Sequence, residues 1–104
     1  MSIVSINKDN FESEVLNETK TVLVDFNADW CGPCRMLKPV LDELSNERDD
    51  YKFVSVNIDD EEELSDKYQV SSIPCLVVLK DGKEIKRSVG FKTKDELNIF
   101  LGDK

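Results

Sequence analysis

Histidine is absent from this sequence of 104 residues. Imidazole is therefore unavailable as a general base, as a metal ligand or as a neighbour that stabilises a thiolate, which excludes several classes of enzyme. Long apolar runs are absent as well, and the first ten residues (MSIVSINKDN) have neither the basic start nor the apolar stretch of a signal peptide. We expect a cytoplasmic protein that makes no membrane contact.

Cysteine, proline and glycine are scarce, at three, three and four residues. Three cysteines without an export signal do not suit a structural disulfide framework, so redox or metal chemistry is the better expectation. The net charge of −8 disfavours nucleic acid as a partner, because such binding depends on Lys and Arg that neutralise phosphates. The length predicts a single domain over residues 1–104, which we expect to be a monomer.

Short apolar runs typical of strands alternate with helical stripes, in the order βαβαβαββα. Strands are predicted at residues 3–6, 21–28 and 52–58, and in a hairpin over residues 75–89 that turns at Asp81-Gly82. The segment 21–28 (TVLVDFNA) is too apolar for a half-exposed strand, so we place it in the centre of the sheet.

Helices are predicted to follow the first three strands and to end the chain. One begins at Asp9, with Glu12 at capping-box spacing, and another at Thr93, with Glu96 at the same spacing. A third extends over about residues 34–45 and contains Pro39, where a kink is expected. The acidic segment 59–70 is the remaining helix, whose negative charges suit the positive end of the helix dipole.

The residues with redox chemistry are concentrated in the segment WCGPC, which joins the central strand to the helix predicted over residues 34–45. Cys31 and Cys34 at a helix start should lie about 5 to 6 Å apart, within reach of a disulfide. Pro33 suits the first turn, where its missing N–H has no helical partner to lose. Free amides and the helix dipole favour a thiolate at Cys31, which we expect to be the exposed nucleophile, while Cys34 is the buried resolving thiol.

Two other readings of this pair remain open. A purely stabilising disulfide closes so short a loop that it restricts the unfolded chain by only about 2 kcal/mol, and a reducing compartment would oppose it. A structural zinc site needs four ligands, whereas the chain offers one CxxC, the distant Cys75 and no histidine.

Asp25 and Trp30 flank this segment on its N-terminal side. Asp25 ends an apolar run, so it is either a solvated strand-end carboxylate or a buried acid with a raised pKa that exchanges a proton with Cys34. Trp30 is either a core residue or a flat wall that limits the access of water to the dithiol.

The chain resembles the thioredoxin family from end to end. The segments that carry the resemblance are DFNADWCGPC, NID, SIPCLVVLKDG and VGF. The resemblance implies an α/β thioredoxin fold, with a central five-stranded mixed sheet flanked by four helices. It also implies a thiol–disulfide oxidoreductase that reduces protein disulfides through its own dithiol, without a metal or other cofactor. The implied partners are disulfide-containing proteins and a thioredoxin reductase, either NADPH-linked or ferredoxin-linked.

The resemblance also assigns residues to roles. Cys31 matches the attacking cysteine, Cys34 the resolving one and Asp25 the buried acid. A substrate-binding surface is implied around them, formed by Trp30, Gly32, Pro33, Ile73, Pro74 and Gly90. Within it, Pro74 matches the family's cis-proline, although the residues alone would favour a trans turn. Ile73 matches the residue whose backbone pairs with substrate, and Gly90 matches the small residue that leaves room for the substrate.

Three positions depart from the family pattern. Ser55 stands where a lysine is frequent, so Asp25 lacks a cationic neighbour, and Asn27 replaces an aromatic residue. Cys75 stands where threonine is usual. It is either an inert small residue at a strand start or a modulator that tunes the dithiol or captures Cys31 under oxidative stress.

Two further functions compete with disulfide reduction. A binding module would dock a partner without using the dithiol. A metal–thiolate or iron–sulfur protein would use Cys31, Cys34 and Cys75, shared across a dimer. The lack of histidine between the cysteines favours a reductant over an oxidase.

Overall fold

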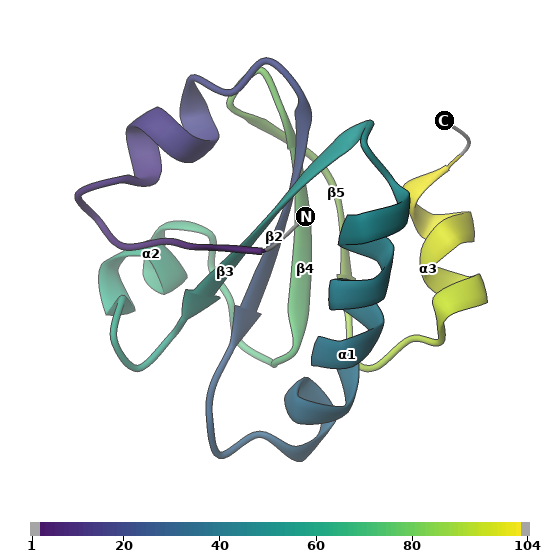
Figure 1. Cartoon of the computed structure of the whole chain (residues 1–104). Coiled ribbons are helices and arrows are strands. Elements are labelled where there is room, and N and C mark those ends of the chain that lie inside the picture. Colours follow the sequence, from purple (N-terminus) through teal and green to yellow (C-terminus); the bar gives the residue numbers. More distant parts are fainter. Residues whose placement is uncertain (1–2, 103–104) are drawn as a thin grey trace.

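The computed structural model describes residues 3–102, so the first two and last two residues of the predicted domain lie outside it. Five strands form one mixed sheet in the order β1-β3-β2-β4-β5 (Figure 1). They are β1 (Val4–Ser5), β2 (Thr21–Asn27), β3 (Tyr51–Asn57), β4 (Cys75–Lys80) and β5 (Lys83–Val89). β1, β2 and β3 are parallel, whereas β4 is antiparallel to both β2 and β5. The predicted five-stranded mixed sheet with β2 at its centre is confirmed.

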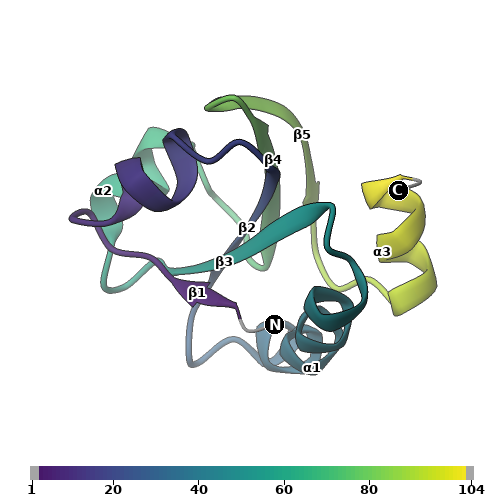
Figure 2. The same ribbon diagram turned by 45° about the horizontal axis from the view of Figure 1, so that its top comes forward.

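Four helical segments cover the two faces of the sheet, as Figures 1 and 2 show. The π-helical η1 (Glu12–Leu16) and α2 (Glu62–Lys67) lie on one face, and α1 (Gly32–Glu47) and α3 (Lys94–Leu101) lie on the other. Each face has its own apolar cluster. Phe11, Val15 and Leu64 pack in the η1–α2 cluster, and Leu41 and Leu97 in the α1–α3 cluster. This two-sided cover explains the nearly continuous apolar sequence of β2.

Local turn signals were reliable where one short segment contains both partners. Asp81 and Gly82 both have positive φ values, 52° and 78°, as a tight hairpin turn requires. Thr93 and Glu96 form the predicted capping box, with Thr93 Oγ1 accepting from the Glu96 amide at 3.2 Å and Glu96 Oε1 accepting from the Thr93 amide at 2.9 Å. Both predictions are confirmed.

Helix starts next to asparagines differ from the prediction. Asp9 does not cap η1, because the Asn7 side chain accepts from the amides of Asp9 and Asn10 at 2.8 and 3.0 Å and holds them in a turn. Asn57 Oδ1 likewise accepts from the amides of Asp59 and Asp60, so α2 begins only after Glu61 and is shorter than expected.

Helix α1 begins at Gly32, earlier than the sequence pattern predicted, and Pro39 lies within it. The kink expected at Pro39 stays a prediction. None of the helices in the described part of the chain is long and apolar enough to cross a membrane.

Candidate active site

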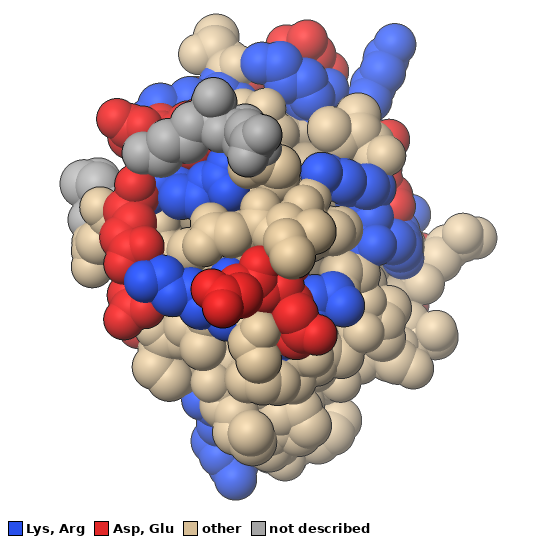
Figure 3. Space-filling model, turned by 90° about the vertical axis from the view of Figure 1, so that its right-hand side faces the viewer, with Lys and Arg blue, Asp and Glu red and all other residues tan. Residues whose placement is uncertain are grey.

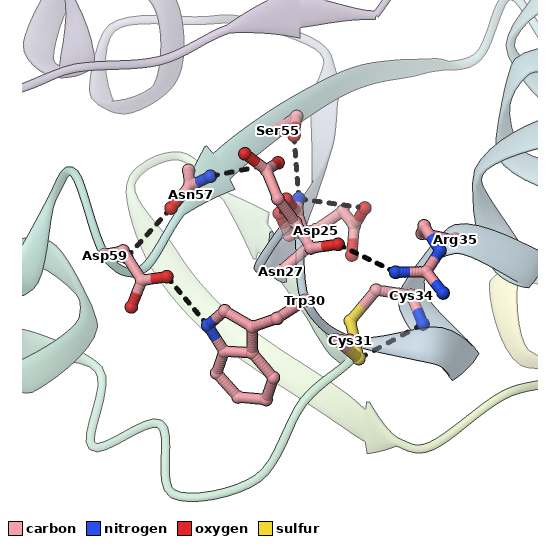
Figure 4. Close-up of a disulfide and its surroundings, with 10 residues drawn as sticks. Asp25, Asn27, Trp30, Cys31, Cys34, Arg35, Ser55, Asn57 and Asp59 are labelled. Carbon is pink, nitrogen blue, oxygen red and sulfur yellow. Dashed lines mark hydrogen bonds between the residues drawn. A yellow bond between two sulfur atoms is a disulfide. The ribbon is translucent and has the colours of Figure 1, made fainter.

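The CGPC segment lies at the end of β2 and the start of α1. Cys31 is the N-cap residue of α1, and its Sγ accepts a hydrogen bond from the Cys34 amide at 3.2 Å. The Cα atoms of Cys31 and Cys34 are 5.2 Å apart, and the two residues form a disulfide (Figure 4). Pro33 lies in the first turn of the helix, as predicted. The sulfur of Cys31 therefore occupies the position where helix amides stabilise a negative charge.

Both cysteines are buried in the disulfide form, each with 5% of its surface exposed. The expected exposure of Cys31 is therefore wrong for this form. The disulfide packs against buried Ala28 and against the half-buried side chains of Ile58 and Ile73. Ile73 belongs to the segment before β4, so this packing unites parts of the chain that are far apart in the sequence.

Trp30 precedes the disulfide and is 66% exposed, so its reading as a core residue is wrong. Its indole Nε1 donates a hydrogen bond of 2.8 Å to Asp59 Oδ2 (Figure 4). Asp59 is itself held by the hydrogen bond from its amide to Asn57. The ring is thus fixed as a surface feature next to the disulfide.

The segment before β4 lies beside the disulfide as well. The Ile73–Pro74 peptide is cis, as the resemblance implies, and Pro74 is buried. The Gly90 amide donates to the Pro74 carbonyl at 2.8 Å. Gly90 has a φ of +97°, a conformation that only glycine adopts readily. Gly32 has no comparable requirement, because it is the first residue of helix α1 and does not have a positive φ.

Asp25 is buried on β2, with 8% of its surface exposed, so the reading as a solvated strand end is wrong. Its Oδ2 accepts a hydrogen bond from Asn27 Nδ2 at 3.2 Å, whereas its buried Oδ1 has no partner within the described residues. Burial raises the pKa of this carboxyl from its usual 3.8 to about 7, and the hydrogen bond from Asn27 opposes that rise.

A cavity of about 730 Å³ connects this acid to the resolving cysteine. Asp25, Asn27, Cys34 and Ser55 line it, together with exposed side chains such as Lys38. The volume is ample for several water molecules.

Cys75 follows Pro74 directly, but its thiol is not brought to the disulfide. It is 1% exposed and packs in the η1–α2 cluster, whereas Cys31 and Cys34 form a separate cluster. Burial raises the pKa of the Cys75 thiol, and the nearby Arg87 guanidinium opposes that rise. Within residues 3–102, no three Cys, Asp or Glu side chains are placed to hold a metal ion together.

The site also includes three polar residues that were not predicted as site residues, although the resemblance had marked Asn27 and Ser55 as departures from the family pattern. Asn27 and Ser55 contact each other beside Asp25, and Asp59 binds Trp30. Asn27 could have been found, because residues two apart on a strand share a face and Asn27 follows Asp25 at that spacing. Ser55 comes from another strand, and only the resemblance linked it to Asp25. Asp59 also comes from another segment and carried no signal.

Charged groups are distributed unevenly around this end of the molecule. Figure 3 shows the face formed by α1 and α3, where charged side chains gather toward the upper part. The lower end, which carries the start of α1 in Figure 1, is largely uncharged apart from a cationic side chain that projects below.

A disulfide at a helix start, next to a cis-proline and a buried acid, defines a protein of dithiol–disulfide exchange. Residues 2–103 match the sequence model of the family described as Thioredoxin. The chain is 47% identical over 102 residues to the thioredoxin of Bacillus subtilis (strain 168), which covers 97% of this chain and 96% of that protein. It is 49% identical over 92 residues to the thioredoxin of Chlamydia caviae, with 88% of each chain covered.

The chain belongs to the thioredoxin family. It is a thiol–disulfide oxidoreductase that reduces protein disulfides through the dithiol of Cys31 and Cys34, by way of a mixed disulfide. Thioredoxins use their own dithiol for this reaction and need no cofactor. Their partners are in general disulfide-containing substrates and a reductase.

Proposed function

We propose that this thioredoxin is a general protein-disulfide reductant in the cytoplasm, and that a thioredoxin reductase recharges it with electrons from NADPH or ferredoxin. The observation that carries the proposal is the position of Cys31 Sγ, which accepts a hydrogen bond from the Cys34 amide at the N-terminus of α1. In the reduced protein the same amide and the helix dipole stabilise a thiolate at this sulfur. No histidine is available to stabilise it further, which favours a reductant over an oxidase.

The reaction proceeds in two exchange steps. The Cys31 thiolate attacks one sulfur of the substrate disulfide, which forms a mixed disulfide and releases the other substrate sulfur as a thiolate. Cys34 then loses its proton and attacks Cys31 Sγ, which forms the Cys31–Cys34 disulfide and releases the second substrate thiolate. Two electrons have moved from the protein to the substrate. The reductase returns them by reducing the same disulfide.

Asp25 is the proposed acceptor of the Cys34 proton. A carboxyl whose pKa is raised to about 7 accepts and returns a proton near neutral pH. Both groups line the same cavity, which supplies the route.

The substrate-binding surface is proposed around the disulfide. Ile73 offers its backbone to an extended substrate segment, and the buried Pro74 orients that backbone. Gly90 leaves space opposite, while Trp30, Gly32 and Pro33 form the adjoining wall. We propose in addition that residues 1–104 are one domain and act as a monomer, with neither nucleic acid nor membrane as a partner.

An insulin-reduction assay with dithiothreitol tests the function. Cys31→Ser should reduce the rate to that of dithiothreitol alone, and Cys34→Ser should accumulate a mixed disulfide that mass spectrometry detects. Cys75→Ala is the matched control, because its thiol packs away from the disulfide, and it should retain wild-type activity. Equal rates for wild type and Cys31→Ser would contradict the proposal and favour a binding module, which a Cys31→Ser, Cys34→Ser double variant would preserve.

The source of electrons needs a separate assay. The oxidised protein is offered to an NADPH-linked and to a ferredoxin-linked thioredoxin reductase, and the appearance of free Cys31 thiol is followed by alkylation. Reduction by one of the two identifies the donor. Reduction by neither would contradict the recharging step.

A further inference from the structure

The side chain of Asn27 joins three oxygen atoms beside the candidate proton acceptor. Its Nδ2 lies 3.2 Å from Asp25 Oδ2, 2.9 Å from the Asp25 carbonyl oxygen and 2.8 Å from Ser55 Oγ (Figure 4). An amide nitrogen has two hydrogens and no lone pair to offer, so Asn27 is the donor in all three contacts and one of its hydrogens is shared between two acceptors. Asn27 therefore stabilises a negative charge on Asp25 rather than its protonated form.

Sheet geometry explains why these residues meet. Asp25 and Asn27 lie two apart on β2, so both side chains project from the same face of the sheet. Ser55 is level with Asp25 in the parallel register of β2 and β3. The face is the one that α1 covers, because Leu23, two residues before Asp25, packs in the α1–α3 cluster. Asn27, Ser55, Asp25 and Cys34 accordingly line one cavity.

The strands around Asp25 offer no cation at this position within the described residues. Ser5 of β1, Ser55 of β3 and Leu76 of β4 are uncharged. The charged or titratable groups that share the cavity come from α1 and the loop before it, and they are Asp29, Cys34, Arg35, Lys38 and Asp42. Arg35 Nη1 donates to the Asp29 carbonyl at 3.0 Å, which directs its guanidinium to the loop. Asp25 Oδ2 accepts its side-chain hydrogen bond from the neutral Asn27.

We propose that Asn27, anchored by Ser55, is a positioning residue that orients the Asp25 carboxylate toward the cavity and sets the pH range in which Cys34 resolves the mixed disulfide. The proposal rests on the proposed role of Asp25 as the acceptor of the Cys34 proton. The neutral Asn27 amide stabilises the Asp25 carboxylate, as a neighbouring cation would do more strongly. Loss of the amide leaves the burial of Asp25 unopposed, so the carboxyl stays protonated to higher pH and the resolving step requires higher pH.

Two variants remove the parts of this arrangement one at a time. Asn27→Leu keeps the approximate size of the side chain and removes the donor. Ser55→Ala leaves the donor but releases its anchor. Ser5→Ala is the matched control, because Ser5 lines the same cavity and lies on β1 beside β3, yet it is not part of the hydrogen-bonded set of Asp25, Asn27 and Ser55.

Two readouts separate the inference from the proposed function. The Asp25 carboxyl is titrated by carbon-13 NMR, and the release of substrate thiol from a preformed Cys31 mixed disulfide is followed against pH. Asn27→Leu should move both midpoints to higher pH by about one unit, as the loss of a hydrogen bond to a charged group predicts. Ser55→Ala should move them less, and Ser5→Ala should not move them.

An unchanged or lower NMR midpoint in Asn27→Leu would overturn the inference while leaving Asp25 as acceptor. A raised NMR midpoint with an unchanged kinetic profile would instead refute Asp25 as the acceptor, and the inferred control of the resolving step with it. Should Asn27→Leu fail to fold, Asn27→Asp is the second variant. It has the same shape, lacks the donor and adds a second carboxylate, so it should raise the NMR midpoint further.

Discussion

Replacement of Asp25 by asparagine should make the protein more stable at high pH and leave it little changed in acid. The carboxyl is 8% exposed, and burial raises its pKa from 3.8 to about 7. That difference of about three pH units corresponds to about 4 kcal/mol at roughly 1.4 kcal/mol per unit. This is the free energy that the folded protein loses when the buried group ionises, and it is the upper limit for the gain in Asp25→Asn.

The sign follows from where the proton is bound. Between pH 3.8 and about 7 the folded protein keeps the Asp25 proton, which the unfolded chain has released. The contribution of this group is therefore greatest below pH 3.8, decreases as pH rises through this range and is constant above about pH 7. The amide that replaces the carboxyl in Asp25→Asn is neutral throughout, so the difference between the two proteins traces this one group.

Denaturant unfolding of both oxidised proteins between pH 4 and pH 9 measures the difference. The variant should gain up to about 4 kcal/mol over wild type by pH 8, with most of the change between pH 4 and pH 7. Asp42→Asn is the control, because Asp42 lines the same cavity but is exposed to solvent, and it should not reproduce this slope. A stability difference that is flat across pH would show that Asp25 is not buried as an acid and would refute the argument.

Three further predictions test other parts of the structure. Cys75 should resist iodoacetamide in the native oxidised protein and react only after unfolding, because it is 1% exposed and burial raises the pKa of its thiol. Mass spectrometry should show only the Cys31–Cys34 bridge, and labelling of Cys75 in the native protein would contradict the prediction. Thr93→Ala should lower the unfolding free energy by about 1 kcal/mol through loss of the capping box, and Thr93→Ser should stay close to wild type. Equal losses of stability in the two variants would contradict a capping role for the hydroxyl. Gly90→Ala should lower the unfolding free energy by about 1–2 kcal/mol because Gly90 has a φ of +97°, whereas Gly32→Ala should lower it much less. Thermal unfolding compares the two variants, and similar losses of stability would contradict the conformational explanation.

Several features of the fold could be predicted because their causes lie within a few residues. The Asp81-Gly82 turn needs only residues that tolerate positive φ, and the capping box needs only Thr93 and Glu96. The same locality misled the prediction at η1 and α2. There, side chains of Asn7 and Asn57 accept hydrogen bonds from backbone amides and hold them in turns, and an asparagine at such a position is compatible with either a turn or a helix start.

The sequence by itself determined the chemistry of this thioredoxin. Two cysteines at CxxC spacing, placed between an apolar strand and a helix, are enough to bring two sulfurs within bonding distance, because strand and helix geometry are local. Tertiary structure decided the environment of that chemistry. It buried Asp25 and joined Asn27 to Ser55 by a hydrogen bond. It also packed Ile73 against the disulfide and placed Cys75 in the other cluster, and each of these features brings together segments far apart in the chain. Such contacts depend on which strands become neighbours and in what register, and only the assembled sheet specifies that.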